Sequence, residues 1–313
     1  MKPGKDDIVA AIERITPFIH HTPVLQSHIL NELVGANLFF KCENFQRAGA
    51  FKMRGATNAI LSLKDKAFQN GVATHSSGNH AAALALAAKD LGVKAFIVMP
   101  DNSSKVKVEA VKRYGGQITF CEPTIRGREE MLEAIIASTN ALEIHPYNNP
   151  FIIAGQATAA KELFDEVGPL EHIIAPVGGG GLLSGTALST HYFSPTTTVI
   201  AAEPINADDA YRSFLSGKIE PVSPKQTIAD GLRTSLGTIT FPIIKEHVSE
   251  ILTVSEESII EAMRLIWTRM KIIVEPSSAV PFAAILSNKE QFRNKKIGII
   301  ISGGNVDLDH LPW

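Results

Sequence analysis

The chain has 313 residues, of which 45% are hydrophobic and 20% are charged, a composition typical of a globular protein with a sizeable core. The net charge of −2, without a basic run of five residues, argues against binding to nucleic acid, and no apolar stretch is long enough to span a bilayer. The only two cysteines, Cys42 and Cys121, lack the spacing of a metal-binding pair, which favours a reducing, cytoplasmic setting.

Strand-like and helix-like segments alternate along the first half of the chain. Residues 8–15 are predicted to form an amphipathic helix and not a signal peptide, because charged residues interrupt the apolar ones. The elements that follow are predicted, in chain order, to be strands at 38–42 and 71–75, a helix at 79–91, a strand at 95–99, a helix at 105–114, a strand at 118–121 and a helix at 129–138.

The same alternation continues beyond Pro150. The pattern predicts, in chain order, a helix at 157–167, strands at 173–177 and 198–202, a helix at 256–270 with Ser255 as its N-cap, and a strand at 297–301. Fully apolar strands between helices indicate parallel twisted sheets that helices cover on both faces. The predicted fold class is therefore α/β.

The length of the chain suggests about two domains. Residues 70–142 form a compact run of alternating strands and helices, which reads as a unit inserted into a larger one. We therefore expect a small domain at 70–142 and a large domain built from residues 1–69 and 143–313.

Four consecutive glycines, at positions 178–181, follow the apolar strand at 173–177. Backbone without Cβ atoms lets several N–H groups converge, and a helix start adds positive charge, so this junction suits a phosphate. A Walker A loop is excluded because no lysine follows, and a dinucleotide fingerprint fails at Leu183, where its third glycine belongs. A small phosphate monoester, such as pyridoxal 5′-phosphate (PLP), and a simple flexible turn remain.

The segment around Lys52 carries a second signal. The lysine lies between Phe51 and Met53, with Gly49 and Gly55 on either side. An amine among apolar neighbours loses part of its charge and can form a Schiff base with an aldehyde. A surface lysine at a helix start explains the segment alone, but a nearby phosphate loop favours the aldehyde-binding role.

Two polar segments follow predicted strands. Residues 76–80, Ser-Ser-Gly-Asn-His, join a strand to a helix, and their hydroxyl, amide and backbone N–H groups suit a carboxylate. Plain N-capping is the simpler interpretation. Ser302 directly follows the strand at 297–301, and α/β proteins bind ligands at the ends of parallel strands, although a glycine turn also fits.

A third polar segment, at 203–209, follows the strand at 198–202. Its two carboxylates, Glu203 and Asp209, and the backbone carbonyl of Ala207 suit a hard divalent cation that keeps some of its water. A solvated acidic turn fits the spacing equally well.

The segments Phe51-Lys52-x-Arg54-Gly55, 76–80, 178–181 and 302–305 occur in the order of the fold-type-II PLP enzymes, which the chain resembles over nearly its whole length. It is similar above all to the serine racemase and serine–threonine dehydratase group. The resemblance implies a two-domain, tryptophan synthase β-like fold. In that fold the large domain binds PLP and the small domain grips the substrate.

The resemblance implies roles for the residues around the cofactor. Lys52 would form the Schiff base with PLP and later act as a base at the substrate Cα, and Phe51 would pack beside the ring. Asn79 would bond to the ring 3′-oxygen. Ser302 would leave the ring nitrogen largely unprotonated, which favours racemisation and β-elimination over transamination. The phosphate would be held by the N–H groups of the glycine run, Gly178, Gly179, Gly180 and Gly181.

The resemblance also places the substrate. Its carboxylate would be held by Ser76, Ser77, Asn79 and His80. Arg128 and Ser235 match positions near the end of the substrate side chain. Racemisation needs a second acid/base opposite Lys52, and the hydroxyl of Ser77 can supply it. We therefore expect a serine racemase that also removes the β-hydroxyl of serine and threonine.

Glu203, Asp209 and the carbonyl of Ala207 would bind Mg²⁺ or Mn²⁺ as a structural activator, and the resemblance implies a homodimer. Two positions depart from the pattern. Ala82 stands where the animal racemase has a glutamine near its ATP site, which puts nucleotide activation in doubt. Ala50 replaces a serine, as in the hydroxyaspartate dehydratases and many bacterial dehydratases.

Two other functions stay open. A threo-3-hydroxyaspartate ammonia-lyase would carry nearly the same motifs, with Arg128 as the partner of a second carboxylate. A two-lobed small-molecule binding module without catalysis is a more distant interpretation, against which the retention of Lys52 argues.

Overall fold

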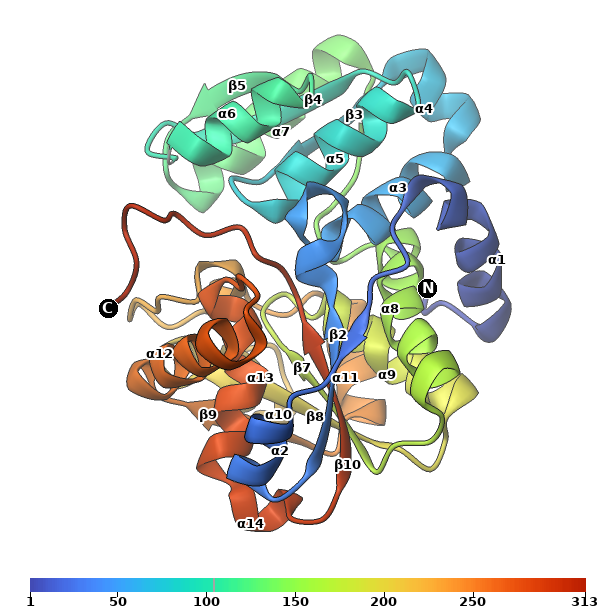
Figure 1. Cartoon of the computed structure of the whole chain (residues 1–313). Coiled ribbons are helices and arrows are strands. Elements are labelled where there is room, and N and C mark those ends of the chain that lie inside the picture. The colour runs from blue at the N-terminus through green and yellow to red at the C-terminus, as the bar shows by residue number, and fades with distance from the viewer. Residues whose placement is uncertain (104) are drawn as a thin grey trace.

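The computed structural model describes residues 1–103 and 105–313 and contains two sheets, one above the other in Figure 1. The larger sheet has the order β1-β2-β10-β7-β8-β9, and all its neighbouring strands are parallel except β1 and β2. Its strands are β1 (Val24–Leu25), β2 (Asn37–Cys42), β7 (His172–Pro176), β8 (Thr198–Pro204), β9 (Glu250–Val254) and β10 (Lys296–Ile301).

The smaller sheet is fully parallel and has the order β5-β4-β3-β6. Its strands are β3 (Val72–His75), β4 (Ala95–Pro100), β5 (Gln117–Cys121) and β6 (Leu142–Glu143). Parallel sheets flanked by helices confirm the predicted α/β class.

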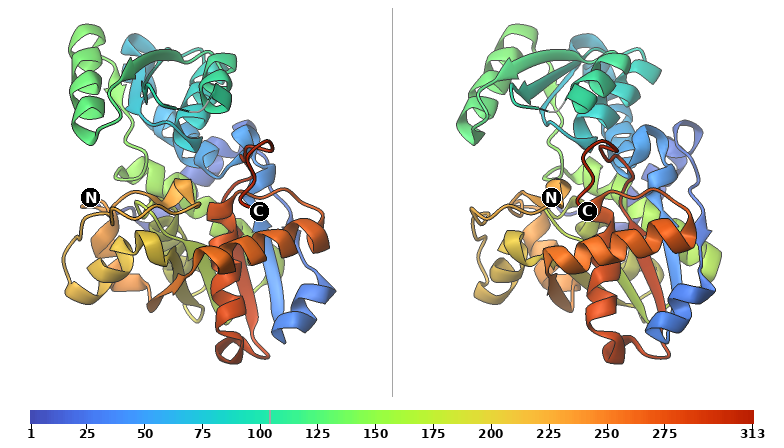
Figure 2. Two further views of the ribbon diagram at one scale, coloured as in Figure 1. Left: turned by 90° about the vertical axis from the view of Figure 1, so that its left-hand side faces the viewer. Right: turned by 60° about the vertical axis from the view of Figure 1, so that its left-hand side comes forward.

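Helices cover both sheets (Figure 2). The α-helices are α1 (Lys5–Ile15), α2 (His28–Val34), α3 (Lys52–Ser62), α4 (Lys64–Asn70), α5 (Asn79–Asp90), α6 (Lys105–Arg113), α7 (Ile125–Thr139), α8 (Pro150–Val167), α9 (Gly181–Phe193), α10 (Asp209–Ser216), α11 (Thr240–His247), α12 (Glu256–Leu265), α13 (Pro276–Ser287) and α14 (Lys289–Phe292). Shorter helical turns are η1 (Thr16–Phe18), η2 (Glu43–Phe45), η3 (Arg47–Gly49), η4 (Ile205–Ala207), η5 (Asp230–Leu232) and η6 (Ile266–Met270).

The larger sheet is buried on both faces because its central strands are mostly apolar. Ile299 and Ile174 point into a core that α12 and α13 share, whereas Ile300 and Ile173 point into a core on the side of α8 and α9. Successive residues of one strand thus serve opposite layers, as a continuous apolar run predicts.

The largest differences between the predicted and observed helices lie at one end of two of them. The helix predicted at 157–167 begins earlier, at Pro150, because the side chain of Asn149 accepts the N–H groups of Phe151 and Ile152. The helix predicted at 256–270 is α-helical only to Leu265 and then π-helical, and its predicted N-cap, Ser255, is confirmed.

Helix α3 joins the two sheets. Its Met53 and Ile60 belong to the same apolar cluster as Leu84 of α5 and Ile97 of β4, and the helix also packs on α8. Helix α3 precedes residue 70, yet it packs against the elements of the smaller sheet. The boundaries of the predicted small domain, residues 70 and 142, therefore stay a prediction. Of the helices in the described ranges, none is long and apolar enough to cross a membrane.

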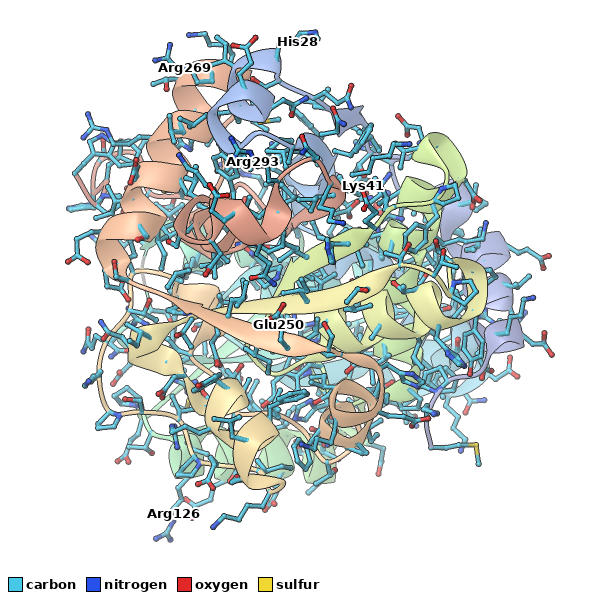
Figure 3. All side chains as sticks on the ribbon, turned by 90° about the horizontal axis from the view of Figure 1, so that it is seen from below. His28, Lys41, Arg126, Glu250, Arg269 and Arg293 are labelled. Atoms are coloured by element: carbon cyan, nitrogen blue, oxygen red, sulfur yellow. The ribbon has the colours of Figure 1, made fainter. Side chains whose placement is uncertain are left out.

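A buried ionic network anchors α3. The guanidinium of Arg54 donates to both oxygens of Glu43, at 2.7 and 2.8 Å, and to both oxygens of Glu162, at 2.6 and 2.7 Å. Lys41 on β2 donates to Glu162 at 2.6 Å and is fully buried. In Figure 3, by contrast, Arg126 and Arg269 lie at the outer edge of the molecule. The network fixes the helix that begins at Lys52.

Candidate functional site

The site lies where strands of both sheets end beside the first turn of α3. The backbone N–H of Phe51 donates to the carbonyl of Ser302 at 2.9 Å, and Ala50 forms a bridge with Gly303. On the other side, the amide of Asn305 donates to Oδ1 of Asn79 at 2.9 Å. These contacts bring three of the predicted segments together, around Lys52, Asn79 and Ser302.

The fourth segment, the glycine run, packs against Tyr147. A Cβ atom on Gly179 would overlap the ring of Tyr147, and one on Gly178 would lie 2.9 Å from Cα of Leu232. Gly180 has a φ of +87°, which favours glycine, and α9 begins at Gly181 without a side-chain cap. The N–H groups at this helix start are therefore available to an anion, so the loop fits a phosphate.

Lys52 connects to the loop that carries Tyr147. Its amine donates to the carbonyl of Pro146 at 2.7 Å and lies 5.1 Å from the centre of the Phe51 ring. Burial lowers the pKa of Lys52 to about 8, although the negative charge of Glu275 opposes this shift. Near neutral pH a minor fraction of the amine is therefore unprotonated, as attack on an aldehyde requires.

Asn79 is held from two sides. Its Nδ2 donates to Oε1 and Oε2 of Glu275, at 2.9 and 3.1 Å, and its Oδ1 accepts from Asn305. The carboxyl of Glu275 is 4% exposed, and burial raises its pKa to about 7. Asn79 thus lies beside a buried acid that the sequence motifs did not include.

Ser302 lies 3% exposed at the end of β10, and its hydroxyl is 2.9 Å from the hydroxyl of Ser278. Ser278 also accepts the N–H of Gly303 and donates to its carbonyl, both at 2.7 Å. The polar partner of Ser302 is therefore a neutral hydroxyl. This environment fits the predicted contact with an unprotonated ring nitrogen.

The turn from β3 to α5 contains residues 76–80. Oγ of Ser76 accepts the N–H of Gly78 at 3.3 Å, and Ser77 is half-buried at the helix start. Nε2 of His80 is 3.0 Å from the carbonyl of Ile144, so this nitrogen carries the proton. Burial, together with the charge of Lys52, lowers the pKa of His80 to about 3. The ring of His80 is therefore neutral.

No hydrogen bond among the described residues joins two predicted substrate residues, Arg128 and Ser235, to this cluster. Arg128 is in the first turns of α7. Burial lowers the pKa of His75, and the charge of Arg128 lowers it further. Nε of Arg128 is buried and has no hydrogen-bond partner among the described residues. Ser235 is half-buried between η5 and α11, and no hydrogen bond within the described ranges joins it to the other site residues.

The three predicted metal ligands meet at the end of β8. Glu203 and Asp209 are fully buried, and Ala207 is 1% exposed. Glu203 accepts the N–H groups of Ala210 and Tyr211, but both oxygens of Asp209 lack a partner in the described part of the chain. Burial raises the pKa of Asp209 to about 7, and burial with the charge of Asp209 raises the pKa of Glu203 well above its ordinary value.

A divalent cation would satisfy these oxygens, so the residues fit the predicted ion. In residues 1–103 and 105–313, no group of three or more histidines, cysteines and acids could hold a metal by side chains alone. The backbone carbonyl of Ala207 and water would have to complete the ligand set.

Sequence reasoning missed three residues of the site: Tyr147, Glu275 and Ser278. An acid inside the apolar run Ile272-Ile273-Val274-Glu275-Pro276 is a usable signal, because an unpaired carboxylate is rarely buried without a role. Tyr147 and Ser278 offer no such signal, since only the fold brings them to the glycine loop and to Ser302.

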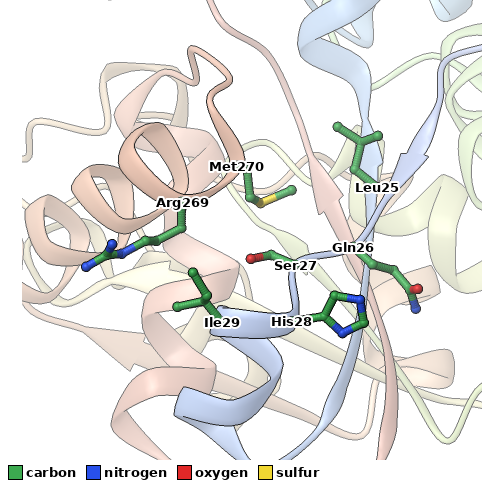
Figure 4. Close-up of a pocket in the computed structure, with 7 residues that line it drawn as sticks. All are labelled: Leu25, Gln26, Ser27, His28, Ile29, Arg269 and Met270. Carbon is green, nitrogen blue, oxygen red and sulfur yellow. The ribbon is translucent and has the colours of Figure 1, made fainter.

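An open pocket of about 360 Å³ lies elsewhere, between the start of α2 and the end of η6 (Figure 4). It is lined by Leu25, Gln26, Ser27, His28, Ile29, Arg269 and Met270. None of the predicted site residues lines it, so it is separate from the cluster around Lys52.

Comparison with known proteins identifies the family. The family model described as "Pyridoxal-phosphate dependent enzyme" matches residues 15–303. A β-hydroxyaspartate dehydratase of Paracoccus denitrificans is 53% identical over 99% of both chains. A serine racemase of Dictyostelium discoideum is 50% identical over 97% of this chain and 95% of its own.

Solved structures agree with this result. The crystal structure of the Dictyostelium discoideum serine racemase superposes with a TM-score of 0.93 at 50% identity, covering 97% of this chain and 99% of that one. The structure of maize serine racemase has a TM-score of 0.96 at 45% identity, covering 99% and 95%, and that of a threonine deaminase has a TM-score of 0.93 at 44% identity, covering 98% and 99%. The fold, the cluster around Lys52 and these relatives lead to one conclusion: the chain belongs to the family of pyridoxal-phosphate-dependent enzymes.

Proposed function

We propose that this enzyme is a serine racemase that also dehydrates serine and threonine. The observation that carries the proposal is the contact network that joins the Lys52 segment to the segments of Asn79 and Ser302, with Ser77 two residues before Asn79. Relatives called serine racemase at 44–50% identity over at least 94% of this chain support the choice.

PLP, when bound, withdraws electrons from the substrate and so makes its Cα proton acidic. The glycine run, Gly178–Gly181, would bind the phosphate through N–H groups. Phe51 would pack on the ring, Asn79 would donate to the ring oxygen through Nδ2, and Ser302 would meet the ring nitrogen with its hydroxyl.

The start of α5 would bind the substrate carboxylate. Ser76 and Ser77 supply hydroxyls, and the first N–H groups of the helix supply donors and a positive dipole end. Because the ring of His80 is neutral and bonded to Ile144, we expect His80 to act through its backbone N–H, while its ring holds α5 against the 144–148 loop.

Two groups would move protons. The Lys52 amine takes the Cα proton on one face, and the Ser77 hydroxyl returns a proton on the other, which inverts the configuration. When the β-hydroxyl leaves as water instead, a second water hydrolyses the unsaturated amine that results, so the carbon skeleton ends as an oxo acid and the nitrogen as ammonia. Racemisation thus needs both residues, whereas elimination needs only the proton transfer by Lys52.

Mg²⁺ or Mn²⁺ at Glu203, Ala207 and Asp209 belongs to the proposal as a structural activator. The orphaned oxygens of Asp209 support it. The charge of Asp209 also contributes, second to burial, to the raised pKa of Tyr147, so the ion would lie near the tyrosine that packs on the glycine loop. We also propose a cytoplasmic homodimer, which rests on the resemblance to the racemases.

One observation favours a second function, a threo-3-hydroxyaspartate ammonia-lyase. Nε of Arg128 is buried and lacks a partner among the described residues, and a guanidinium can bind a second substrate carboxylate. The dehydratase of Paracoccus denitrificans, 53% identical, supports this alternative.

Assays of L-serine, L-threonine and threo-3-hydroxyaspartate side by side separate the two functions. If 3-hydroxyaspartate is the best substrate, we expect Arg128→Met to lower its kcat/KM at least tenfold and to change that of serine little. If serine is the best substrate and D-serine accumulates, the racemase is supported. A colourless protein that turns over none of these three amino acids would instead support the third interpretation, a small-molecule binding module without catalysis.

The role of Ser77 is tested by Ser77→Ala. We expect D-serine formation from L-serine to fall at least a hundredfold, while formation of pyruvate continues, because elimination does not need the second face. Chiral chromatography and a pyruvate assay on the same sample measure both. Persistent D-serine formation would rule out Ser77 as the second acid/base.

A further inference from the structure

Glu275 is a buried acid to which the proposed chemistry assigns no task. It is the N-cap of α13, and its backbone N–H donates to the carbonyl of Gly303 at 3.1 Å. A Cβ atom on Gly303 would lie 3.1 Å from Oε1 of Glu275, so the glycine leaves room for the carboxylate. Burial of a carboxylate is costly unless hydrogen bonds or charges compensate.

Its hydrogen bonds determine how Asn79 is oriented. Above its pKa Glu275 is a carboxylate, which only accepts hydrogen bonds, so it then holds the NH₂ end of Asn79, at 2.9 and 3.1 Å. The amide of Asn305 donates to the oxygen end of Asn79 and also to the carbonyl of Ala48, at 2.8 Å. Asn79 is therefore held in one amide orientation, and its second N–H remains for a ligand.

The charged groups around Glu275 come from three other elements. Asp230 of η5 raises its pKa and Lys107 of α6 lowers it, while Lys52 of α3 has its own pKa raised by Glu275. The charge of Glu275 raises the pKa of Lys52, whereas burial lowers it. The acid thus contacts Asn79 directly and acts on Lys52 through its charge.

We propose that Glu275 is a positioning residue: its carboxyl group holds Asn79 so that an N–H of the amide points at the ring oxygen of PLP. The inference deepens the proposed function, since it rests on the contact between Asn79 and the cofactor. It concerns cofactor capture, in which the amine of Lys52 adds to the aldehyde and one water leaves.

The test uses the apoenzyme and free PLP, without any amino acid. Capture is followed by the absorbance of bound cofactor between pH 6 and 9, which gives an affinity and a midpoint pH for each protein. In Glu275→Gln the charge is lost, so the Lys52 amine should be unprotonated at lower pH. We expect the midpoint to fall by about one pH unit and the affinity to fall about tenfold.

Three further variants separate position from charge. Asn305→Ala releases Asn79 without changing any charge, so its affinity should fall while its midpoint stays. Glu275→Asp keeps the charge on a shorter side chain and should do the same. Glu250→Gln, at a partly exposed acid on β9 labelled in Figure 3, should change neither quantity.

An unchanged affinity in Glu275→Gln would overturn the inference. Thermal unfolding of each apoenzyme shows whether the variant is folded. If Glu275→Gln does not fold, wild-type affinity in Asn305→Ala together with Glu275→Asp overturns the positioning role, and a loss in both supports it. Since no substrate is present, either result is independent of which amino acid the enzyme uses.

Discussion

At the scale of single residues, burial raises the pKa values of two acids, Asp209 and Glu203. Burial raises the pKa of Asp209 from 3.8 to about 7. Such a group favours the folded state below its unfolded pKa, and this contribution is lost as the pH rises through the folded value. The metal-free enzyme should therefore become less stable between pH 5 and pH 8.

A bound Mg²⁺ should offset this loss, because it compensates the two negative charges. We expect Mg²⁺ to raise the Tm by roughly 5 °C at pH 8 and by much less at pH 5. Differential scanning calorimetry with Mg²⁺ or with chelator measures both values.

Asp209→Asn and Asp208→Asn form a matched pair for this prediction. Asp208 precedes Asp209, is half-buried and pairs with Arg212 at 2.9 Å. We expect Asp209→Asn to abolish the Mg²⁺ effect and Asp208→Asn to keep it. An equal response to Mg²⁺ in both variants would place the cation elsewhere.

The sequence allowed single site residues to be predicted where they stand in a recognisable motif. Lys52, Asn79 and Ser302 could be predicted because each stands in a segment of unusual polarity or glycine content next to an apolar strand. Glu275 could have been found as an acid within an apolar run. Ser278 could not, because its partner Ser302 is distant in the chain and an ordinary serine has no distinctive signal.

At the scale of elements, the junction of β7 and α9 depends on the absence of one Cβ atom. Gly179→Ala would drive a methyl group into the ring of Tyr147. We expect a loss of about 1–3 kcal/mol in the free energy of unfolding of the apoenzyme, because overpacking forces the ring or the loop to move. Cofactor affinity should fall as well, since the same loop presents the N–H groups.

Tyr147→Ala should rescue this variant. The double variant Gly179→Ala/Tyr147→Ala removes the clash, so its apoenzyme should be no less stable than Tyr147→Ala alone. Gly4→Ala is the control, because a Cβ atom there meets only Asp7, at 3.7 Å. Additive losses in the double variant, measured by urea unfolding, would contradict the explanation.

Elements were predictable where the pattern of apolar residues was simple. The central strands β7, β8 and β10 each contain an uninterrupted apolar run, at 173–176, 199–202 and 297–301, and all three were predicted. Helix α13 was missed because it is apolar on every side, with Pro281 inside it, and so shows no amphipathic period. The edge strand β9 was missed because polar residues break up its sequence.

At the scale of the whole molecule, an ion pair joins the part that contains the smaller sheet to the larger sheet. Lys107 of α6 donates to Asp230 of η5, next to Leu232, which packs on Gly178. Both partners are partly exposed, so we expect about 0–1 kcal/mol from the pair. Lys107→Gln should therefore raise the KM for the substrate up to about fivefold if the site works only with the two parts together.

Salt and a charge swap test this prediction. The difference in KM between Lys107→Gln and the wild type should shrink in about 1 M salt, because exposed charges are screened. Lys107→Asp/Asp230→Lys should recover part of what each single change loses. Equal KM values for all variants at low salt would show that the pair does not hold the site together.

The order of strands in the larger sheet has a consequence for how the protein is made. Strand β10 lies between β2 and β7, yet it is the last strand in the chain. Until it emerges from the ribosome, β2 has no parallel neighbour and Phe51 has no Ser302 to bond. The strands from Val72 to Glu143 can pair much sooner, because their contacts are local. We therefore expect the nascent chain to form the smaller sheet early and to retain the cofactor only after β10 has been made.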